Sequence, residues 1–501
     1  MTFGARDGAV ARERPWWRNG PLFLVLFTAI VPRLPHLLAP IVGWHSWRQA
    51  DTAAIARNFH ESGMHFLYPA VDWSGAGPGY VESEFPLFSY LVAALYGITG
   101  VHVVWGRALA LLFSVGAALY LGHLCARYTD RWSAACAAAA FSLLPITSYI
   151  GVAFMPESLM LLASVAAIDH MDLWSREGRE QDRWLSAAFL ALAIAVKLPE
   201  LFLGVPITYL VWRRLGWRMF ASIRVWVSSA VALVPPSLWY AHANHLKAMT
   251  GLTFGIWERG TDKWGNLDLL SSPRFYSSLI FSSLIERHLV WAGAALLATG
   301  VVLLRGRRDL GTFSWWVGGA IVYCLVVARG NAVHDYYQLP VLLPLSLWIG
   351  RAIAWSLEPA PMTPARIGAR TLVVAFVVLS LLRVPHFVRK EIAAAPLVDI
   401  GRMVENITPP GSLLVVVDGG DPTLLYHTHR KGWHADTRTL TRAWLEARHA
   451  EGAAYLVALA PRFALPDAAP ELEMLQSAYT DRSNRNDAYV FSLGDPKSAG
   501  N

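Results

Sequence analysis

The stretch PLFLVLFTAIVPRLPHLLAPIVGWHSWRQADTAAIARNF, residues 21–59, sets the expected fold. Its first part, Pro21 to Ile41, is apolar and long enough to cross a bilayer, which takes ~20 helical residues. Its second part, Gly43 to Phe59, is rich in charged and aromatic side chains although it leaves the membrane directly. A plain connecting loop needs none of these groups. We therefore expect a membrane span followed by the first half of an active site at the membrane surface.

The composition is that of an integral membrane protein. Of 501 residues, 54% are hydrophobic and only 16% are charged, whereas a soluble protein carries roughly a quarter charged residues. The formal charge of +7 fits arginine-rich loops, and no basic patch interleaved with aromatic residues points to nucleic acid. The three cysteines, at positions 125, 136 and 324, lie in apolar or basic surroundings and predict neither a disulfide framework nor a thiolate metal site.

The first apolar run is expected to stay in the mature protein. A secretory signal peptide would be followed by a small-residue cleavage site, but here prolines at positions 32 and 35 interrupt the run and no such site follows. The run is preceded by Arg6, Arg12, Arg14 and Arg18.

Apolar runs predict spans near 20–41, 103–123, 133–150, 156–174, 184–199, 200–213, 225–243, 288–304, 312–328, 338–357 and 370–386. Residues 85–98 are apolar but short. If they do not span, the arginine clusters near 127, 176, 213, 305 and 366 all fall on the side of the N-terminal arginines, as the positive-inside rule requires. We therefore predict eleven spans, with residues 42–100 as one outside loop that carries an interfacial helix at 85–98.

The chain divides into two domains by composition. Residues 1–386 form the predicted transmembrane domain, and residues 387–501 read as a small soluble α/β domain on the outer side. In the second domain SLLVVVDG, AYLVAL and AYVFSL are short apolar runs typical of buried strands, and LTRAWLEARHA is typical of a helix.

Asp51 is the first candidate for chemistry. If residues 49–61 form a helix, Asp51 shares a stripe with Ile55 and Phe59. A carboxylate on an apolar stripe is costly unless it is paired or used. The alternative to a functional role is an ion pair with Arg48 that fixes the loop.

Other charged groups are predicted on the same outer surface. Glu82 and Glu84 precede the interfacial helix, and Glu157 begins the fourth span. Each of the last two also suits a helix N-terminus, where a carboxylate favours the helix dipole. Lys197 ends an apolar run before Pro199, where its cation either snorkels to the interface or contacts a lipid phosphate.

A short outside loop before the tenth span carries His334, Tyr336 and Tyr337. Interfacial tyrosines are common belt residues, so each alone indicates little. Together with the carboxylates and Lys197, they predict a reaction on a lipid that carries a phosphate.

The order of these features resembles the GT-C membrane glycosyltransferases that use polyprenyl-phosphate sugars, a group that includes protein O-mannosyltransferases and the aminoarabinose transferase of lipid A. The resemblance covers most of residues 20–350. It is carried by RQADTAAIARNFHESG, EFPLFSYLVAALYGITG, FMPESLMLL, AVKLPELFLGVP and HDYYQLPVLLPLSLWIG, together with the hairpin that begins RALALLFSVGAALYLGH.

The resemblance implies roles for individual residues. Asp51 would take the acceptor proton or position the acceptor, Glu157 would be the second acidic residue, and Lys197 would contact the donor phosphate. Two departures stand out. The family often has Asp-Glu where this chain has Arg48 and Gln49, and often has Lys-Pro-Pro where this chain has Glu84-Phe85-Pro86. A phosphate-binding lysine is therefore missing from that position, and Glu84 would serve the acceptor or a cation.

The predicted mechanism is a direct, inverting displacement at the anomeric carbon. Asp51 is the base, Glu84 and Glu157 orient the acceptor or a divalent cation, and Lys197 and Arg57 stabilise the departing phosphate. Arg57 has an alternative as the i,i+4 partner of Glu61. Arg48, Glu82, His334, Tyr336 and Tyr337 are candidate substrate-binding residues. No metal ligand is assigned and no cofactor is certain, because the histidines lack paired spacing.

The predicted partners are a polyprenyl-phosphate-linked sugar donor, a lipid, glycan or protein acceptor, and membrane lipids. The main alternative function is a transporter or flippase of a lipid-linked substrate, which would show symmetric halves with broken helices at the midplane. A non-catalytic scaffold and an enzyme that ligates glycans on lipid carriers are further alternatives. High arginine, alanine and tryptophan content suggests a bacterial cytoplasmic membrane, with the active site and C-terminal domain on its outer side.

Overall fold

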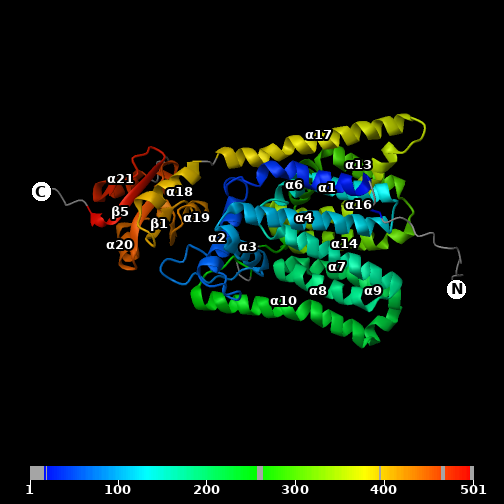
Figure 1. Cartoon of the computed structure of the whole chain (residues 1–501), viewed down its shortest axis with the longest axis horizontal. Coiled ribbons are helices and arrows are strands. Elements are labelled where there is room, and N and C mark those ends of the chain that lie inside the picture. Colours follow the sequence, from blue (N-terminus) through cyan, green and yellow to red (C-terminus); the bar gives the residue numbers. More distant parts are fainter. Residues whose placement is uncertain (1–15, 18–19, 257–262, 394–395, 464–468, 497–501) are drawn as a thin grey trace.

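A computed structural model describes residues 16–17, 20–256, 263–393, 396–463 and 469–496. The N-terminal arginines used in the charge argument, at positions 6, 12, 14 and 18, lie outside these ranges. A bundle of long helices forms most of the molecule, and a smaller domain with a sheet lies at one end of the bundle (Figure 1). In this view α17 and α10 flank the bundle on opposite sides.

The helical part begins with α1 and η1 and the helices of the first loop. Their bounds, and those of the helices up to the first long turn, are α1 Gly20–Ile30, η1 Val31–His36, α2 Ser46–Glu61, α3 Leu87–Thr99, α4 Val103–Ala126, α5 Arg131–Leu143, α6 Pro145–Ile150, α7 Glu157–Glu177, α8 Glu180–Val196, η2 Leu198–Leu203, α9 Gly204–Leu215, η3 Gly216–Ala221 and α10 Ile223–Thr250.

The second half of the bundle contains a π-helical segment, η4, that runs directly into α13. The bounds are α11 Leu267–Leu270, α12 Pro273–Ser277, η4 Ser278–Leu289, α13 Val290–Leu303, η5 Arg308–Leu310, α14 Gly311–Val326, α15 Ala328–Val333, η6 Asp335–Gln338, α16 Leu339–Leu357 and α17 Pro364–Ala393.

Within the described ranges, five helices are long and apolar enough to cross a membrane, and a sixth is added if the bent pair Leu198–Ala221 and Ile223–Thr250 counts as one span. The chain bends by 106° between the two parts of that pair. The predicted eleven spans include several shorter helices that this criterion does not reach, so the exact number stays a prediction. The short apolar segment predicted at 85–98 forms α3, a helix of 13 residues.

Small residues let the helices approach closely. α5 carries a run of alanines that packs against α16, and a Cβ on Gly350 of α16 would lie 2.6 Å from the Cβ of Ala137. Similarly, a Cβ on Gly300 of α13 would lie 1.9 Å from a backbone oxygen of α16. In a bilayer, where apolar burial does not drive helices together, such close backbone contact is a main source of association.

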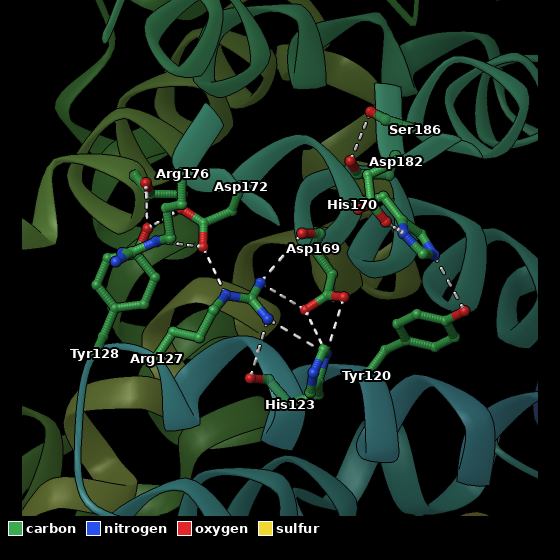
Figure 2. A network of polar contacts seen from close by, with 12 residues as sticks. Tyr120, His123, Arg127, Tyr128, Asp169, His170, Asp172, Arg176, Asp182 and Ser186 are labelled. Carbon is green, nitrogen blue, oxygen red and sulfur yellow. Dashed lines mark hydrogen bonds and ion pairs between the residues drawn. The ribbon is translucent and has the colours of Figure 1, made fainter. Parts of the chain in front are cut away.

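A polar network joins the C-terminal ends of α4 and α7 to α8 and α9 (Figure 2). Fully buried Asp172 accepts from Arg127 Nε at 2.7 Å and from Arg213 Nη2 at 2.8 Å. Asp169 pairs with Arg127, and His170 Nδ1 lies 2.8 Å from Asp182. Arginines from several predicted loops thus meet at one end of the bundle, in agreement with the grouping used to count spans.

The C-terminal domain is built on a five-stranded sheet in the order β2-β1-β3-β5-β4. β1 is parallel to β2 and β3, whereas β5 is antiparallel to β3 and β4. The three predicted strands are confirmed as β1, β3 and β5, and the predicted helix as α20. The bounds are α18 Pro396–Ile407, β1 Leu413–Val417, α19 Thr423–His427, β2 Lys431–Ala435, η7 Thr437–Thr439, α20 Arg442–Ala450, β3 Ala453–Leu459, η8 Ala460–Phe463, α21 Ala469–Ala478, β4 Tyr479–Asp481 and β5 Ala488–Pro496.

The first loop holds this domain against the bundle. Gly432 of the edge strand β2 donates from its backbone N–H to the carbonyl of Asp72 at 3.0 Å and accepts from the N–H of Gly75 at 2.7 Å. His427 Nε2 lies 2.7 Å from the carbonyl of Ile41. The loop therefore pairs with an edge strand that would otherwise present free backbone groups.

Candidate active site

Helix α2 is the centre of the first outside loop. The prediction placed it at 49–61, and the structure begins it at Ser46, after His45 in the left-handed region at φ 52°. Nearly every residue from Ser46 to Phe59 is buried. α2 packs against α3 on one side and against α19 of the C-terminal domain on the other. The loop is therefore a packed layer between the bundle and the small domain.

A chain of alternating charges runs from α2 into the bundle. Arg48 pairs with Glu84, and Lys197 Nζ lies 2.9 Å from Glu84 Oε1 and 3.0 Å from Glu157 Oε1. Arg48, Glu157 and Lys197 are all less than a tenth exposed. Two cations and two carboxylates offset each other, which is the arrangement that buried charge requires. We call Arg48, Glu84, Glu157 and Lys197 the ion-pair cluster.

Local sequence places each member of the ion-pair cluster at an element end. Glu157 is the first residue of α7, directly after Pro156, where its charge favours the helix dipole. Lys197 adopts an extended conformation after α8 because Pro199 has no N–H to donate to the Ala195 carbonyl, which accepts from the Phe85 N–H and the Tyr240 hydroxyl instead. Burial acts to raise the pKa of Glu84, but the cations of Arg48 and Lys197 outweigh it and hold that pKa well below its usual range. Glu84 is therefore ionised at any physiological pH.

An apolar cavity of about 390 Å³ ends at this cluster. Glu84, Glu157 and Lys197 line one part of it, together with Lys263. The remaining wall is mostly hydrophobic and includes Met160, Phe202, Val205, Val322, Val326 and Pro340, which belong to α7, η2, α9, α14 and α16. A long apolar chain fits such a cavity, with a charged group at its polar end.

A second, more polar pocket of about 490 Å³ adjoins the first. Both are lined by Glu84, Lys197, Lys263, Tyr336 and Tyr337. The second pocket adds Trp47, Arg48, Phe254, Arg329 and His334. The two spaces therefore meet at the ion-pair cluster, one apolar and the other rich in cations.

Lys263 was not predicted from the sequence. Its Nζ donates to the carbonyls of Phe254 and Gly255 at 3.2 and 3.0 Å. Burial lowers the pKa of its ammonium group, and nearby Glu84 opposes this effect. Among the described residues, no carboxylate lies within ion-pair distance of Lys263, unlike Lys197. It lies in the long loop after α10, where no periodic pattern marked it.

The loop before α16 forms another part of the wall of the polar pocket, through His334, Tyr336 and Tyr337. His45 Nε2 lies 3.0 Å from Asp335 Oδ1, and the His45 ring packs edge-on against Tyr336 at 4.8 Å between centroids. Burial lowers the pKa of His334 to about 4, with the charges of His45 and Lys197 acting in the same direction. His334 is thus a neutral imidazole at neutral pH and can hydrogen-bond a substrate without adding positive charge.

Asp51 forms no ion pair with this cluster. Its Oδ1 accepts from Trp73 Nε1 at 2.9 Å, and the side chain is 4% exposed. Burial raises the pKa of Asp51 to about 7, although the Trp73 hydrogen bond and Arg48 act to lower it. The alternative considered from the sequence was an ion pair between Asp51 and Arg48. In the structure Arg48 pairs with Glu84 instead. Neither cavity described above is lined by Asp51.

Arg57 and Glu82 have structural partners. Arg57 pairs with Asp72, donates to the carbonyl of Tyr426 at 3.1 Å and lies over the Tyr426 ring. The sequence alternative, a pair with Glu61, is replaced by Asp72. These contacts place Arg57 at the junction with the C-terminal domain instead of at a phosphate, because its guanidinium is buried there. Fully buried Glu82 accepts from Thr253 and so anchors the loop that carries Lys263.

The carboxylates do not gather around a cation site. Across the described ranges, no group of three or more His, Cys, Asp or Glu side chains is arranged to hold a metal ion. Glu84 and Glu157 instead share the ammonium group of Lys197.

Comparison with solved structures decides the fold. The chain superimposes on ArnT from Cupriavidus metallidurans bound to undecaprenyl phosphate with a TM-score of 0.64 and 15% identity, over 94% of this chain and 97% of that chain. The chain has the GT-C fold. This confirms the resemblance inferred from the order of motifs.

A second GT-C structure, the oligosaccharyltransferase of Archaeoglobus fulgidus in the apo form, matches with a TM-score of 0.59 and 10% identity, over 93% of this chain and 74% of that chain. The archaeal enzyme AglB from the same organism, in complex with an inhibitory peptide and a dolichol-phosphate, matches with a TM-score of 0.54 and 10% identity, over 96% and 75% of the two chains.

Residues 83–240 match the sequence profile of the dolichyl-phosphate-mannose-protein mannosyltransferase family. This GT-C segment runs from just before Glu84 to α10 and includes Glu157 and Lys197. Comparison with curated proteins finds no match.

Proposed function

We propose that this protein is a glycosyltransferase that moves a sugar from a polyprenyl-phosphate carrier to an acceptor at the membrane surface on the side of the first loop. One observation carries the proposal. An apolar cavity within the bundle ends at a buried cluster of cations and carboxylates, where a polar pocket begins. This arrangement suits a molecule with a long apolar tail, a phosphate and a polar head, in that order. The undecaprenyl phosphate of ArnT and the dolichol-phosphate of AglB have the first two of these parts, the apolar tail and the phosphate.

In this proposal Lys263, Lys197 and Arg48 bind the phosphate of the donor. Lys197 and Arg48 are already balanced by Glu84 and Glu157, whereas Lys263 donates to backbone carbonyls. A phosphate at the junction of the two cavities would therefore gain most from Lys263, because, of these three cations, it alone has no carboxylate partner among the described residues. This lysine, from a different loop, takes the place of the one that is missing before Pro86.

In this proposal Asp51 is the base that takes the proton from the acceptor hydroxyl. Asp51 follows Arg48 by three positions on α2, so the two side chains are neighbours on the helix surface. A base works best when its pKa lies near the working pH, and burial brings the pKa of Asp51 to about 7. The acceptor hydroxyl would pass its proton to Asp51 as its oxygen bonds to the anomeric carbon. The bond from that carbon to the phosphate oxygen breaks, and its electron pair leaves with polyprenyl phosphate.

Glu84, Glu157 and the aromatic residues would position the reactants. Ionised Glu84 holds Arg48 and Lys197 in place, and Glu157 holds Lys197 from the other side. Tyr336, Tyr337 and neutral His334 line the polar pocket, where hydroxyl and imidazole groups can bind the donor sugar. The direct displacement would invert the anomeric centre. We place the reaction at the outer face of a bacterial cytoplasmic membrane, in accord with the arginine distribution.

The decisive experiment measures transfer and carrier binding separately. The purified protein in nanodiscs is given radiolabelled polyprenyl-phosphate sugars and a crude membrane-glycan acceptor fraction. We expect label on the acceptor with wild type, and loss of transfer with Asp51→Asn while polyprenyl phosphate still binds. If the protein turns over none of a broad panel of polyprenyl-phosphate sugars, the proposed function is rejected and a transporter of lipid-linked substrates is favoured.

Lys263→Gln tests the donor site in the same assay. Loss of a charge-assisted hydrogen bond is worth about 1.5–3 kcal/mol, so carrier binding should weaken by about 10-fold or more. Lys247→Gln is the matched control, because Lys247 lies on α10 and lines neither cavity described above. Equal carrier binding by the Lys263 and Lys247 variants would contradict the phosphate assignment.

A further inference from the structure

The C-terminal domain presents a polar edge to the first loop. In an open α/β sheet, ligands bind beyond the carboxyl ends of parallel strands, where neighbouring strands connect in opposite directions. β1 is such a strand, since it lies between β2 and β3 and is parallel to both. Asp418 follows β1 directly, and Gly419 and Gly420 then adopt positive φ angles of 77° and 85°. The Gly420 N–H donates to Asp418 Oδ1 at 3.0 Å.

His434, on the neighbouring strand β2, is held by Asp418. Its Nδ1 lies 3.1 Å from each carboxylate oxygen of Asp418. Its other ring nitrogen, Nε2, is buried and has no hydrogen-bond partner among the described residues. Burial acts to lower the pKa of His434, but the Asp418 hydrogen bond and charge raise it overall. The His434 ring is therefore held in one orientation by Asp418, and its second nitrogen, Nε2, has no partner among the described residues.

The first loop supplies the facing groups. The ring of Trp73 lies 6.1 Å from the ring of His434, and Trp73 Nε1 donates to Asp51 Oδ1. The negative charge of Asp51 acts on His434, although the two are too far apart for an ion pair. Trp73 is only partly buried and the His434 side chain is 17% exposed, so a ligand can reach both.

Side-chain contacts connect Trp73 and His434 to the polar pocket. The ring of Trp73 lies 6.5 Å from that of Phe254, and Arg48 lies over the face of Phe254 at 5.0 Å. Phe254 and Arg48 line the pocket that ends at the ion-pair cluster. A row of side chains thus leads from the proposed donor site to the C-terminal domain.

We propose that Asp51, Trp73 and the Asp418-held His434 form a carbohydrate-binding subsite for the acceptor, shared between the first loop and the C-terminal domain. A sugar at this position would place one hydroxyl on the Asp51 carboxylate, as donor, and another on the free Nε2 of His434. The aromatic face of Trp73 would cover the apolar face of the sugar ring. The identification of this sugar as the acceptor rests on the proposed function, whereas the sugar-binding subsite itself does not.

Binding of simple sugars tests the subsite without turnover. Saturation-transfer NMR is recorded on the full-length protein in nanodiscs with a panel of methyl glycosides of hexoses and N-acetylhexosamines. We expect at least one glycoside to bind wild type. Its binding should weaken by about 10-fold or more in His434→Phe, which keeps a ring but loses the ring nitrogens, and in Trp73→Ala. His429→Gln, at a half-exposed histidine of the same domain, should bind as wild type does.

The outcomes separate this proposal from the proposed function. Unchanged binding of polyprenyl phosphate by His434→Phe would show that the variant folds; if it does not fold, Asp418→Asn replaces it with the same expectation. Absence of glycoside binding by wild type, or equal binding by the His434 and His429 variants, would overturn the subsite even if transfer activity is found. Glycoside binding that depends on His434 in a protein without transfer activity would support the subsite and reject the proposed function.

Discussion

Replacing Asp51 with asparagine should stabilise the protein at alkaline pH. Asp51 is 4% exposed, and burial raises its pKa from 3.8 to about 7. The folded protein therefore keeps a proton that the unfolded chain releases, and the free energy of unfolding falls as the pH rises from about 4 to about 7. Asparagine is neutral at every pH and can still accept from Trp73, so the variant avoids this loss.

The expected size of the effect follows from the shift. A rise of about three pKa units at about 1.4 kcal/mol each makes ionised Asp51 cost about 4 kcal/mol above pH 7, and almost nothing near pH 4. The stability of Asp51→Asn relative to wild type should therefore increase through this range and then level off. The other groups that face Asp51, namely Arg48, Asp72 and His434, are present in both proteins.

Unfolding midpoints of wild type and Asp51→Asn are measured between pH 5 and pH 8.5 in one detergent. Asp268→Asn, at an exposed aspartate, is the control for a change of charge alone. Infrared titration adds a direct readout: wild type should show one protonated-carboxyl component that disappears near pH 7, and this component should be missing from the variant. Parallel stability curves for wild type and Asp51→Asn across the range would refute the reasoning.

Three further predictions concern the frame around the site. Arg57→Ala leaves Asp72 buried without its cation, which costs about 3–5 kcal/mol, and should loosen the C-terminal domain; limited proteolysis should cut between α17 and α18 sooner than in wild type. Glu84→Gln removes the charge shared by two buried cations and should lower the unfolding midpoint at all pH values above 5, because the pKa of Glu84 lies far below that range; an unchanged midpoint would contradict the ion-pair cluster. Gly300→Ala places a Cβ 1.9 Å from a backbone oxygen of α16 and should abolish monodisperse expression, whereas Gly318→Ala points into open space and should behave as wild type.

The sequence predicted what depends on pattern. The helix assumed over residues 49–61 is present as α2, Ser46–Glu61, and three strands of the C-terminal domain were found from short apolar runs. The distribution of arginines among the loops predicted that Glu84, Glu157 and Lys197 lie on the same side of the membrane. In the structure, Lys197 forms ion pairs with both glutamates. Charges at the ends of apolar segments are constrained to membrane depth, which makes such grouping predictable.

The sequence could not predict what depends on long-range packing. Lys263 reaches both cavities because the loop before it is anchored where Thr253 meets Glu82, far away in the chain. Arg57 was assigned to phosphate because its partners, Asp72 and the Tyr426 carbonyl, come from segments that the fold alone brings together. The number of spans also depends on bends, such as the 106° turn before α10, that hydropathy does not reveal.

The backbone pairing of Gly432 with residues 72–75 changes what counts as an exchangeable module. Grafting residues 396–496 from another GT-C protein would leave the loop without its strand and Arg57 without its carbonyl acceptor. The smallest transferable unit is the sheet domain together with the first loop, two pieces separated by almost 300 positions in the chain. Efforts to give this protein a new acceptor by recombination would have to move both pieces at once.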